Sequence, residues 1–455
     1  MFDVLTYQKG GGVLRMLEQY LGADDFRRGI ASYIAKHRYG NTETTDLWDA
    51  LEAATGEPAR STMDTWIYQG GHPVVAVSAE GSTLTLSQHR FRFVASSDDT
   101  ALWRIPVLLR ASVGGEVVRR RLLLTEQSET VDLGGPVDWV VVNEGGWGVY
   151  RVRYSSELLR ALTAQLADLD ALERFNLASD TWASVLAGDT PLDDFVELAR
   201  LLAPVEDDPN VWAVLVGGLE LYERAVAPEA KEGVRALVRE LCRPAFDRLG
   251  WTPQPGEPET AATLRATIVR ALGVLGGDED VRARAVELHA ATEPGSVDPD
   301  LAGALVAIVA DVGGEAPYAD FLRRWRSGAT PQEELRYLYG LTGFEHPALV
   351  RRTLDLTLQE VRSQNAPFMV SLLLANPAAT GDAWAFTKEH WDDLLARVPE
   401  NLVDRMLDGI LATADRAVAE DVQAFLTAHP VASRAKQIEQ LLERLAVNLA
   451  FASRL

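Results

Sequence analysis

The spacing of apolar residues divides the chain into three regions, and the first, residues 1–73, has the period of helices. Its first apolar face is formed by Val13, Leu14, Met16, Leu17 and Leu21, which recur at helical intervals. Gly22 predicts the end of this helix, because glycine readily adopts the left-handed conformation that follows many last turns.

Two further helices are predicted in the same region. Asp24 or Asp25 is expected to cap the second, which would bury Phe26, Ile30, Tyr33 and Ile34. Thr44 or Thr45 is expected to cap the third, which would stop near Gly56.

The second region, residues 74–147, alternates apolar and polar positions with the period of two that is typical of strands. Gly114 and Gly115 predict a hairpin, and residues 137–142 supply the last strand. The pattern predicts a small antiparallel β-sandwich. Its alternating apolar residues include Val75, Val77, Leu84, Leu86, Phe91, Phe93, Trp103, Ile105, Val107 and Leu109.

The third region, residues 148–455, shows only helical periodicity. We expect about sixteen helices, or roughly 40 residues for each helix pair, separated by short breaks at Gly, Pro or Asp. This spacing favours antiparallel pairs stacked as an irregular HEAT-like solenoid with a concave surface. The fold class is therefore mostly α with a small β-sandwich.

Composition narrows the class of partner. The chain has 455 residues, 47% of them hydrophobic, which favours packed domains over disorder. Its formal net charge of −22 repels phosphate backbones, so we expect no nucleic-acid partner. The single cysteine, Cys242, suits the reducing cytoplasm in which we expect the protein. No apolar run reaches the ~18 residues of a membrane span, so no membrane partner is expected.

No self-contained catalytic motif is found in the sequence. The histidines at positions 37, 72, 89, 289, 346, 390 and 429 include no pair four residues apart, the spacing that places two imidazoles on one helix face around zinc. The sequence also has no G-x-S-x-G nucleophile elbow and no phosphate loop with G-K-[ST].

Tyr7 stands three residues before the first of three consecutive glycines, residues 10–12, at the front of the first helix. Glycine weakens a helix by ~1 kcal/mol relative to alanine, so three together indicate the close approach of another backbone or of a ligand. A phenol with pKa ~10 stays protonated at neutral pH. Tyr7 can therefore donate to an oxyanion forming at a peptide carbonyl, which is worth ~3–4 kcal/mol per donor. The alternative is a tyrosine that only anchors the start of the helix.

The segment around Tyr7 carries a family resemblance. Residues 3–11 read D-V-L-T-Y-Q-K-G-G and resemble the D-x-[IL]-[ST]-Y-x-K-G-[AG] segment of zinc aminopeptidases of the aminopeptidase N and puromycin-sensitive type, which are gluzincins. Residues 66–74 read W-I-Y-Q-G-G-H-P-V and resemble the W-x-x-Q-x-G-[YFH]-P segment that ends the family's catalytic domain.

The resemblance continues in order along nearly the whole chain and is weakest over residues 250–330. Residues 142–143 and 148–154 resemble the junction between the family's β-sandwich and its helical domain, and residues 172–188 an early helix pair. It implies three domains: the C-terminal helical part of a thermolysin-like catalytic domain (1–73), a β-sandwich domain (74–147) and a HEAT-like helical C-terminal domain (148–455).

The resemblance also assigns chemistry. It implies that Tyr7 stabilises the tetrahedral intermediate of peptide hydrolysis. The family's zinc site is HExxH with a further glutamate, and a GxMEN stretch holds the free amine of the substrate. None of these is present in the sequence. Zinc is thus expected in the complete family enzyme but not on this chain, which is expected to be inactive alone because it lacks a metal-activated water.

Two arginines of the helical region are candidate substrate-binding residues by the same resemblance. Arg405 aligns loosely with an arginine that reaches the substrate in some relatives, and Arg362 is a second candidate. The alternatives are an ordinary exposed arginine at position 405 and an ion pair between stacked helices at position 362.

Two functions remain open from the sequence. The first is the C-terminal part of an aminopeptidase that acts on peptides, with residues 1–73 bound to the missing N-terminal catalytic portion or to a second copy. Their apolar face is then expected to be open or paired with another chain. The second is a non-catalytic peptide-binding or scaffold protein that uses the concave helical surface.

Overall fold

A computed structural model describes residues 5–94, 99–291 and 297–455. The chain forms two compact units, Met1–Leu198 and Ala199–Leu455. The fold is mostly helical, with two small sheets after the first helices, as the sequence predicts. No described helix is long and apolar enough to cross a membrane.

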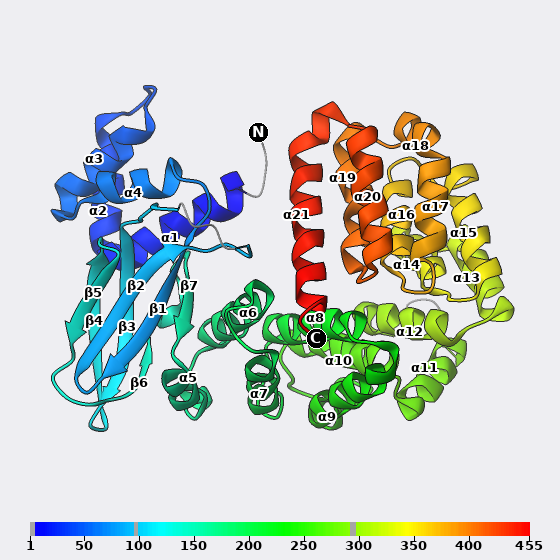
Figure 1. The fold of residues 1–455 in the computed structure, drawn as a ribbon, viewed down its shortest axis with the longest axis horizontal. Helices are drawn as coiled ribbons and strands as arrows, with labels where there is room; N and C mark the ends of the chain where they lie inside the picture. The colour runs from blue at the N-terminus through cyan, green and yellow to red at the C-terminus, as the bar shows by residue number, and fades with distance from the viewer. Residues whose placement is uncertain (1–4, 95–98, 292–296) are drawn as a thin grey trace. The chain divides into compact units, whose positions relative to one another are not determined.

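The first unit begins with helices that gather at one end of the sandwich (Figure 1). The first helix ends where expected, because Gly22 follows it with φ 89°. The predicted caps are wrong. Gly22 itself precedes the second helix, and Glu43 caps the third in a reciprocal capping box with Asp46. The elements are η1 (Leu5–Lys9), α1 (Gly10–Leu21), α2 (Ala23–Lys36), α3 (Thr44–Thr55) and α4 (Ala59–Ile67).

The sandwich that follows has two sheets. One has the strand order β5-β2-β1-β7 and the other β4-β3-β6. The glycine hairpin at residues 114–115 is confirmed between β3 and β4. The strands are β1 (Pro73–Glu80), β2 (Thr83–Arg90), β3 (Ile105–Val113), β4 (Glu116–Leu124), β5 (Ser128–Asp132), β6 (Val137–Val141) and β7 (Arg151–Tyr154).

Two details of the predicted sandwich are wrong. The sheets are not wholly antiparallel, because β7 pairs parallel to β1 with Val75 opposite Val152. Phe91 and Phe93 lie beyond the end of β2 rather than in a strand, and they stack edge to face on each other. Strand β7 was not expected, since its four residues are too few to show a period of two.

Helix α1 is packed against the sandwich through its apolar face. Met16 and Leu17 belong to the same buried cluster as Trp103 and Val107, and the side chain of Arg121 donates to the carbonyl of Tyr20 at 2.8 Å. The expectation that the apolar face of residues 1–73 is open is therefore wrong for α1. Among the side chains that the structure describes in this region, the large apolar ones that are exposed are Tyr7, Leu14, Ile34, Tyr39, Ile67 and Tyr68. Ile34 thus also departs from the buried stripe expected of the second helix.

The remainder of the first unit consists of helices that follow β7. Helix α6 packs against β7, and its residues Glu173, Leu177 and Asp180 are buried. The helices that begin in this unit are α5 (Ser156–Thr163), α6 (Ala171–Ala187) and α7 (Leu192–Leu202), which continues into the second unit.

The second unit is all helical where it is described, and many consecutive helices pack against each other, as α13 packs against α14. It departs from an open stack in one respect: the last helix, α21, returns to pack against α8, as Figure 1 also shows. The buried clusters of the described part of this unit include one around Phe321 and one around Leu373.

The α-helices of the second unit differ in length from 5 to 19 residues. They are α8 (Pro209–Ala225), α9 (Lys231–Leu249), α10 (Thr260–Arg270), α11 (Glu279–Ala291), α12 (Pro299–Val312), α13 (Glu315–Ser327), α14 (Pro331–Gly340), α15 (Pro347–Gln359), α16 (Ala366–Ala375), α17 (Thr380–Glu389), α18 (Trp391–Arg397), α19 (Val403–Leu407), α20 (Arg416–Ala428) and α21 (Ala435–Ala452).

Candidate functional site

Tyr7 lies in η1, a single π-helical turn that runs directly into α1. Its side chain is 60% exposed, so the phenol lies at the surface of the first unit rather than in its core. A buried tyrosine that anchors the helix start, the alternative considered from the sequence, does not match this exposure. Asp3 and Val4 of the same motif lie outside the described residues.

The glycines after Tyr7 have different surroundings. A Cβ built on Gly12 would lie 3.1 Å from the side chain of Val149, so this position lets α1 approach the sandwich closely. A Cβ on Gly11 would meet nothing within 4 Å. Close packing therefore accounts for Gly12 and leaves Gly11 unexplained by it.

Lys9 connects the Tyr7 turn to the loop before β1. Its ammonium donates to the carbonyl oxygen of Gly71 at 3.0 Å and to that of Gln69 at 3.4 Å. Burial lowers the pKa of Lys9, and the nearby Arg90 guanidinium lowers it further. The structure thus brings together the described part of the first family-like segment, residues 5–11, and the second segment, residues 66–74.

The second segment fastens α4 to the sandwich. The indole of Trp66 is buried and donates to the carbonyl of Arg104 at 3.0 Å. The Gln69 side-chain amide donates to the carbonyls of Thr65 at 3.0 Å and Leu102 at 2.9 Å. These bonds hold the loop that presents its carbonyls to Lys9.

His72 lies in the same loop, stacked on Phe91 with ring centroids 5.4 Å apart. The Arg151 guanidinium lies 4.9 Å from the centroid of the same phenylalanine. Burial, followed by the charges of Arg151 and Lys9, lowers the pKa of His72 to about 4. His72 is therefore neutral at physiological pH.

Arg151 joins this region to α6. Its guanidinium donates to Asp180 Oδ1 at 2.9 Å, and the backbone N–H of Val152 donates to Oδ2 of the same carboxylate at 2.9 Å. Burial raises the pKa of Asp180 to about 6, against the opposing effects of Arg151 and of these hydrogen bonds.

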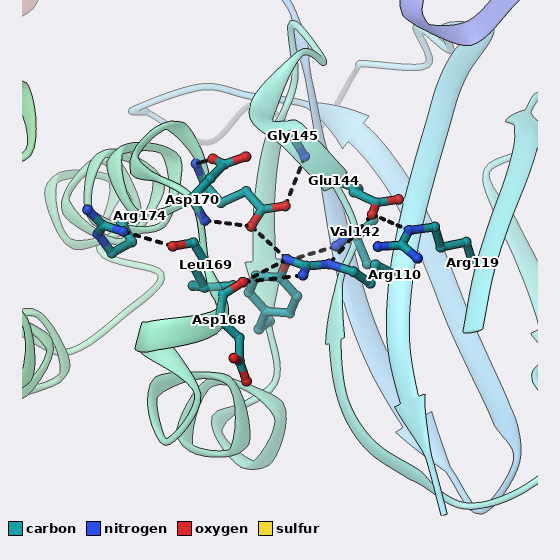
Figure 2. Close-up of polar contacts among 11 residues, drawn as sticks. Arg110, Arg119, Val142, Glu144, Gly145, Asp168, Leu169, Asp170 and Arg174 are labelled. Carbon is teal, nitrogen blue, oxygen red and sulfur yellow. Dashed lines mark hydrogen bonds and ion pairs between the residues drawn. The ribbon is translucent and has the colours of Figure 1, made fainter. Parts of the chain in front are cut away.

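A second polar cluster fixes the sandwich to the start of α6 (Figure 2). Arg110 on β3 donates to Glu173 at 2.7 Å and to the carbonyl of Asp168 at 3.2 Å. The N–H of Gly145 donates to the other oxygen of Glu173 at 2.9 Å, while Asp170 and Glu173 form a capping box. The phenol of Tyr150 donates to the carbonyl of Val142 at 2.8 Å. The family-like segment at residues 148–154 therefore lies at a hydrogen-bonded junction.

The two candidate arginines belong to the second unit, whereas Tyr7 belongs to the first. Arg405, on α19, is exposed and forms an ion pair of 3.2 Å with Asp408 three residues further along the chain. Arg362 is exposed between α15 and α16, and its side chain has no hydrogen-bond or ion-pair partner among the described residues. The ion pair between stacked helices, the alternative considered for Arg362, is absent from that part of the chain.

The described residues do not fit the zinc that the family implies. No three His, Cys, Asp or Glu side chains are grouped so as to hold a metal ion in the described ranges. Cys242 is buried, and burial raises its thiol pKa to about 12, so it is a poor ligand at neutral pH. We therefore derive no step through zinc from this chain.

Sequence reasoning selected Tyr7 but missed Lys9, His72 and Arg151, which surround the loop next to it. All three lie inside segments that carry the family resemblance. That position was the available signal, but their contacts join residues of different elements, such as Lys9 and Gly71, which are 62 positions apart.

Comparisons with known proteins match both ends of this chain to domains of one peptidase family. Residues 139–447 match the family described as the ERAP1-like C-terminal domain, and residues 1–66 match the peptidase family M1 domain. The chain is 29% identical to Aminopeptidase M1-A of Oryza sativa subsp. japonica, over 98% of this chain and 53% of that protein. It is 28% identical to Aminopeptidase M1 of Arabidopsis thaliana, over 98% of this chain and 54% of that protein.

A yeast relative has a similar identity and is also matched over about half of its length. The chain is 29% identical to the alanine/arginine aminopeptidase of Saccharomyces cerevisiae, over 88% of this chain and 47% of that protein. The chain thus spans about half the length of the curated relatives it matches. Its match to the M1 domain ends at residue 66, and the greater part of the similarity is to the C-terminal helical region.

Proposed function

The chain belongs to the M1 aminopeptidase family, and from that membership we propose that it forms the C-terminal part of a zinc-dependent enzyme that removes N-terminal residues from peptides. The observation that carries the proposal is Tyr7. Its phenol is exposed at the surface, and its turn is held against the second family-like segment through Lys9.

In this proposal Tyr7 acts on the developing oxyanion. As the carbonyl carbon of the scissile peptide bond becomes tetrahedral, negative charge collects on its oxygen, and a phenol O–H donates to it without losing its own proton. Zinc, where it is bound, supplies an activated water. We propose that residues outside this chain hold the metal, and that this chain alone is inactive.

The partner of residues 1–73 follows from the same proposal. Tyr7, Ile67 and Tyr68 are exposed apolar side chains near the two segments that Lys9 connects, and exposed apolar groups of this kind mark interaction surfaces. We propose that they contact the metal-binding portion of the M1 domain. A second copy of this chain is the competing occupant, and the molar mass in solution by light scattering distinguishes the two.

The test of the function is an aminopeptidase assay with added zinc. It uses this chain, and this chain extended by the codons upstream of Met1. We expect activity only in the extended chain. Zinc-dependent activity of the short chain would contradict the proposal that the metal ligands lie elsewhere. An inactive extended chain that carries HExxH would favour the scaffold function instead.

The role of Tyr7 has its own test in the active extended chain. Tyr7→Phe removes only the donor, and we expect kcat to fall about 100- to 1,000-fold with little change in KM, because the bond forms in the transition state. Tyr39→Phe, at another exposed tyrosine, is the matched control and should leave kcat unchanged. A Tyr7→Phe enzyme with the original kcat would exclude Tyr7 as the oxyanion donor.

A further inference from the structure

We infer that Lys9 is a positioning residue, whose ammonium group fixes the turn that carries Tyr7 to the loop that leads into β1. The inference rests on the proposed function for its catalytic meaning, since it concerns the orientation of Tyr7. The anchoring itself is a property of this chain and can be measured without any activity.

The first argument is the geometry of the two acceptors. Lys9 Nζ lies 3.0 Å from the carbonyl oxygen of Gly71 and 3.4 Å from that of Gln69. One ammonium group therefore contacts two carbonyl groups of the same loop. Gln69 is itself held by its side chain to the carbonyl of Leu102, and Gly71 has φ 81°. That left-handed conformation favours glycine and sets the direction of its carbonyl. The acceptors are thus already in place for Lys9.

The second argument is electrostatic. Lys9 is partly buried, and the charged group that acts on it most is another cation, Arg90, which pairs with Asp99 at 2.7 Å. His72, which lies in the same loop, is neutral, and the Arg151 cation is paired with Asp180. The Lys9 ammonium donates to two carbonyl oxygens, which have fixed positions in the loop. Two such acceptors offset the desolvation of the ammonium group and define where it lies.

The third argument is the local sequence. Tyr7 precedes Lys9 by two residues in the five-residue turn η1, and Gly10, Gly11 and Gly12 follow directly. Three glycines hold a helical turn weakly, because each loses more backbone freedom on folding than other residues do. Tyr7 is 60% exposed, so burial of its ring contributes little. The hydrogen bonds from Lys9 to the loop at residues 69–71 therefore contribute to holding the turn.

The experiment compares Lys9→Met, Lys9→Arg and Lys36→Met in the full chain. Lys9→Met keeps the length of the side chain but removes the donor, Lys9→Arg keeps a cationic donor, and Lys36→Met is the matched control on the exposed end of α2. Two measurements report on the turn. Amide hydrogen exchange over residues 5–12 and 69–72 measures how readily it opens, and the ring carbon resonance of Tyr7 in tyrosine-labelled protein reports the surroundings of its ring.

We expect Lys9→Met to raise exchange over residues 5–12 about tenfold and to shift the Tyr7 resonance, with Lys9→Arg restoring both toward the original protein. Lys36→Met should change neither, and strand β3 should keep its protection in every variant. Unchanged exchange and resonance in Lys9→Met would overturn the inference. So would a loss of protection that extends through β3, since Lys9 would then stabilise the whole unit rather than position the turn.

Activity separates this inference from the function on which it rests. In an active extended chain, Lys9→Met should lower kcat about tenfold with KM unchanged, and Lys9→Arg should recover it. If Tyr7→Phe has no effect on kcat, the proposed role of Tyr7 fails, while the exchange and resonance data still decide whether Lys9 holds the turn. If Tyr7→Phe abolishes activity and Lys9→Met leaves kcat unchanged, the positioning role fails alone.

Discussion

At the scale of the residue, the loop next to Tyr7 contains a histidine whose charge is suppressed by its surroundings. His72 is stacked on Phe91 and faces the Arg151 and Lys9 cations, and its pKa is lowered to about 4. The unfolded chain takes up the same proton near pH 6.5. The contribution of His72 to stability is therefore complete above about pH 6.5 and is lost as the pH falls toward 4.

His72→Phe is expected to remove this dependence while it keeps an aromatic ring against Phe91. Between pH 7 and pH 4.5 the original protein should lose on the order of 2 kcal/mol more unfolding free energy than the variant does. Urea unfolding at both pH values measures this difference. Every other titrating group, including Asp180, is common to both proteins, so equal losses would show that the environment of His72 does not suppress its protonation.

A second residue-scale prediction concerns the buried pair that joins β7 to α6. Asp180→Ala leaves the Arg151 guanidinium and the Val152 N–H without their acceptor, and we expect a loss of about 3–5 kcal/mol in unfolding free energy. Asp24→Ala removes an exposed Asp–Arg pair, with Arg27, and should cost less than about 1 kcal/mol. Denaturant unfolding compares the two, and similar small losses would mean that the buried pair is not needed.

At the scale of the element, the packing of the short helices in residues 1–73 requires that α2 and α3 approach each other closely. Helix α2 packs against α3 at Gly29, where a Cβ would lie 2.6 Å from Leu51 Cδ2 and 3.1 Å from Leu51 Cα. The backbone atom cannot move aside as a side chain can. Gly29 therefore sets the distance between these two helices.

Gly29→Ala is expected to destabilise the first unit by about 1–3 kcal/mol through overpacking. Gly11→Ala is the matched substitution on α1, where the added Cβ meets nothing within 4 Å. It should instead stabilise by about 0.5–1 kcal/mol, because alanine favours the helix. Thermal unfolding of the two variants should give shifts of opposite sign, and shifts of the same sign would contradict this account of α2 and α3.

At the scale of the whole molecule, the chain has separate cores in its two units. The buried cluster that contains Leu17 lies in the first unit, and the cluster that contains Leu373 lies in the second. Each of these leucines is at most 1% exposed. Separate cores of this kind favour unfolding in more than one step.

Leu17→Ala and Leu373→Ala test this independence. Each should cost about 2–5 kcal/mol in its own unit. We expect calorimetry to show two transitions, with Leu17→Ala lowering one of them and Leu373→Ala lowering the other. Hydrogen exchange assigns each transition to its unit. A single transition that both substitutions lower equally would contradict independent cores.

Local patterns predicted the types of element well and their ends less well. The period change near residue 74, the stop at Gly22 and the hairpin at residues 114–115 depend on neighbouring residues, and all are confirmed. The cap of α3 is Glu43, which is not among the favoured capping residues and acts through a reciprocal pair with Asp46. The parallel strand β7 is too short to carry a pattern of its own.

The sequence by itself determined the family, the succession of helices, sandwich and helices, and the choice of Tyr7 as the candidate oxyanion donor, because each is encoded in local order and spacing. Only the tertiary structure decided that Tyr7 is exposed, that Lys9 bonds to a loop 62 residues away, and that α1 buries its apolar face on the sandwich. These features arise from packing between distant segments, where burial and hydrogen-bond geometry depend on three-dimensional contacts that no local pattern records.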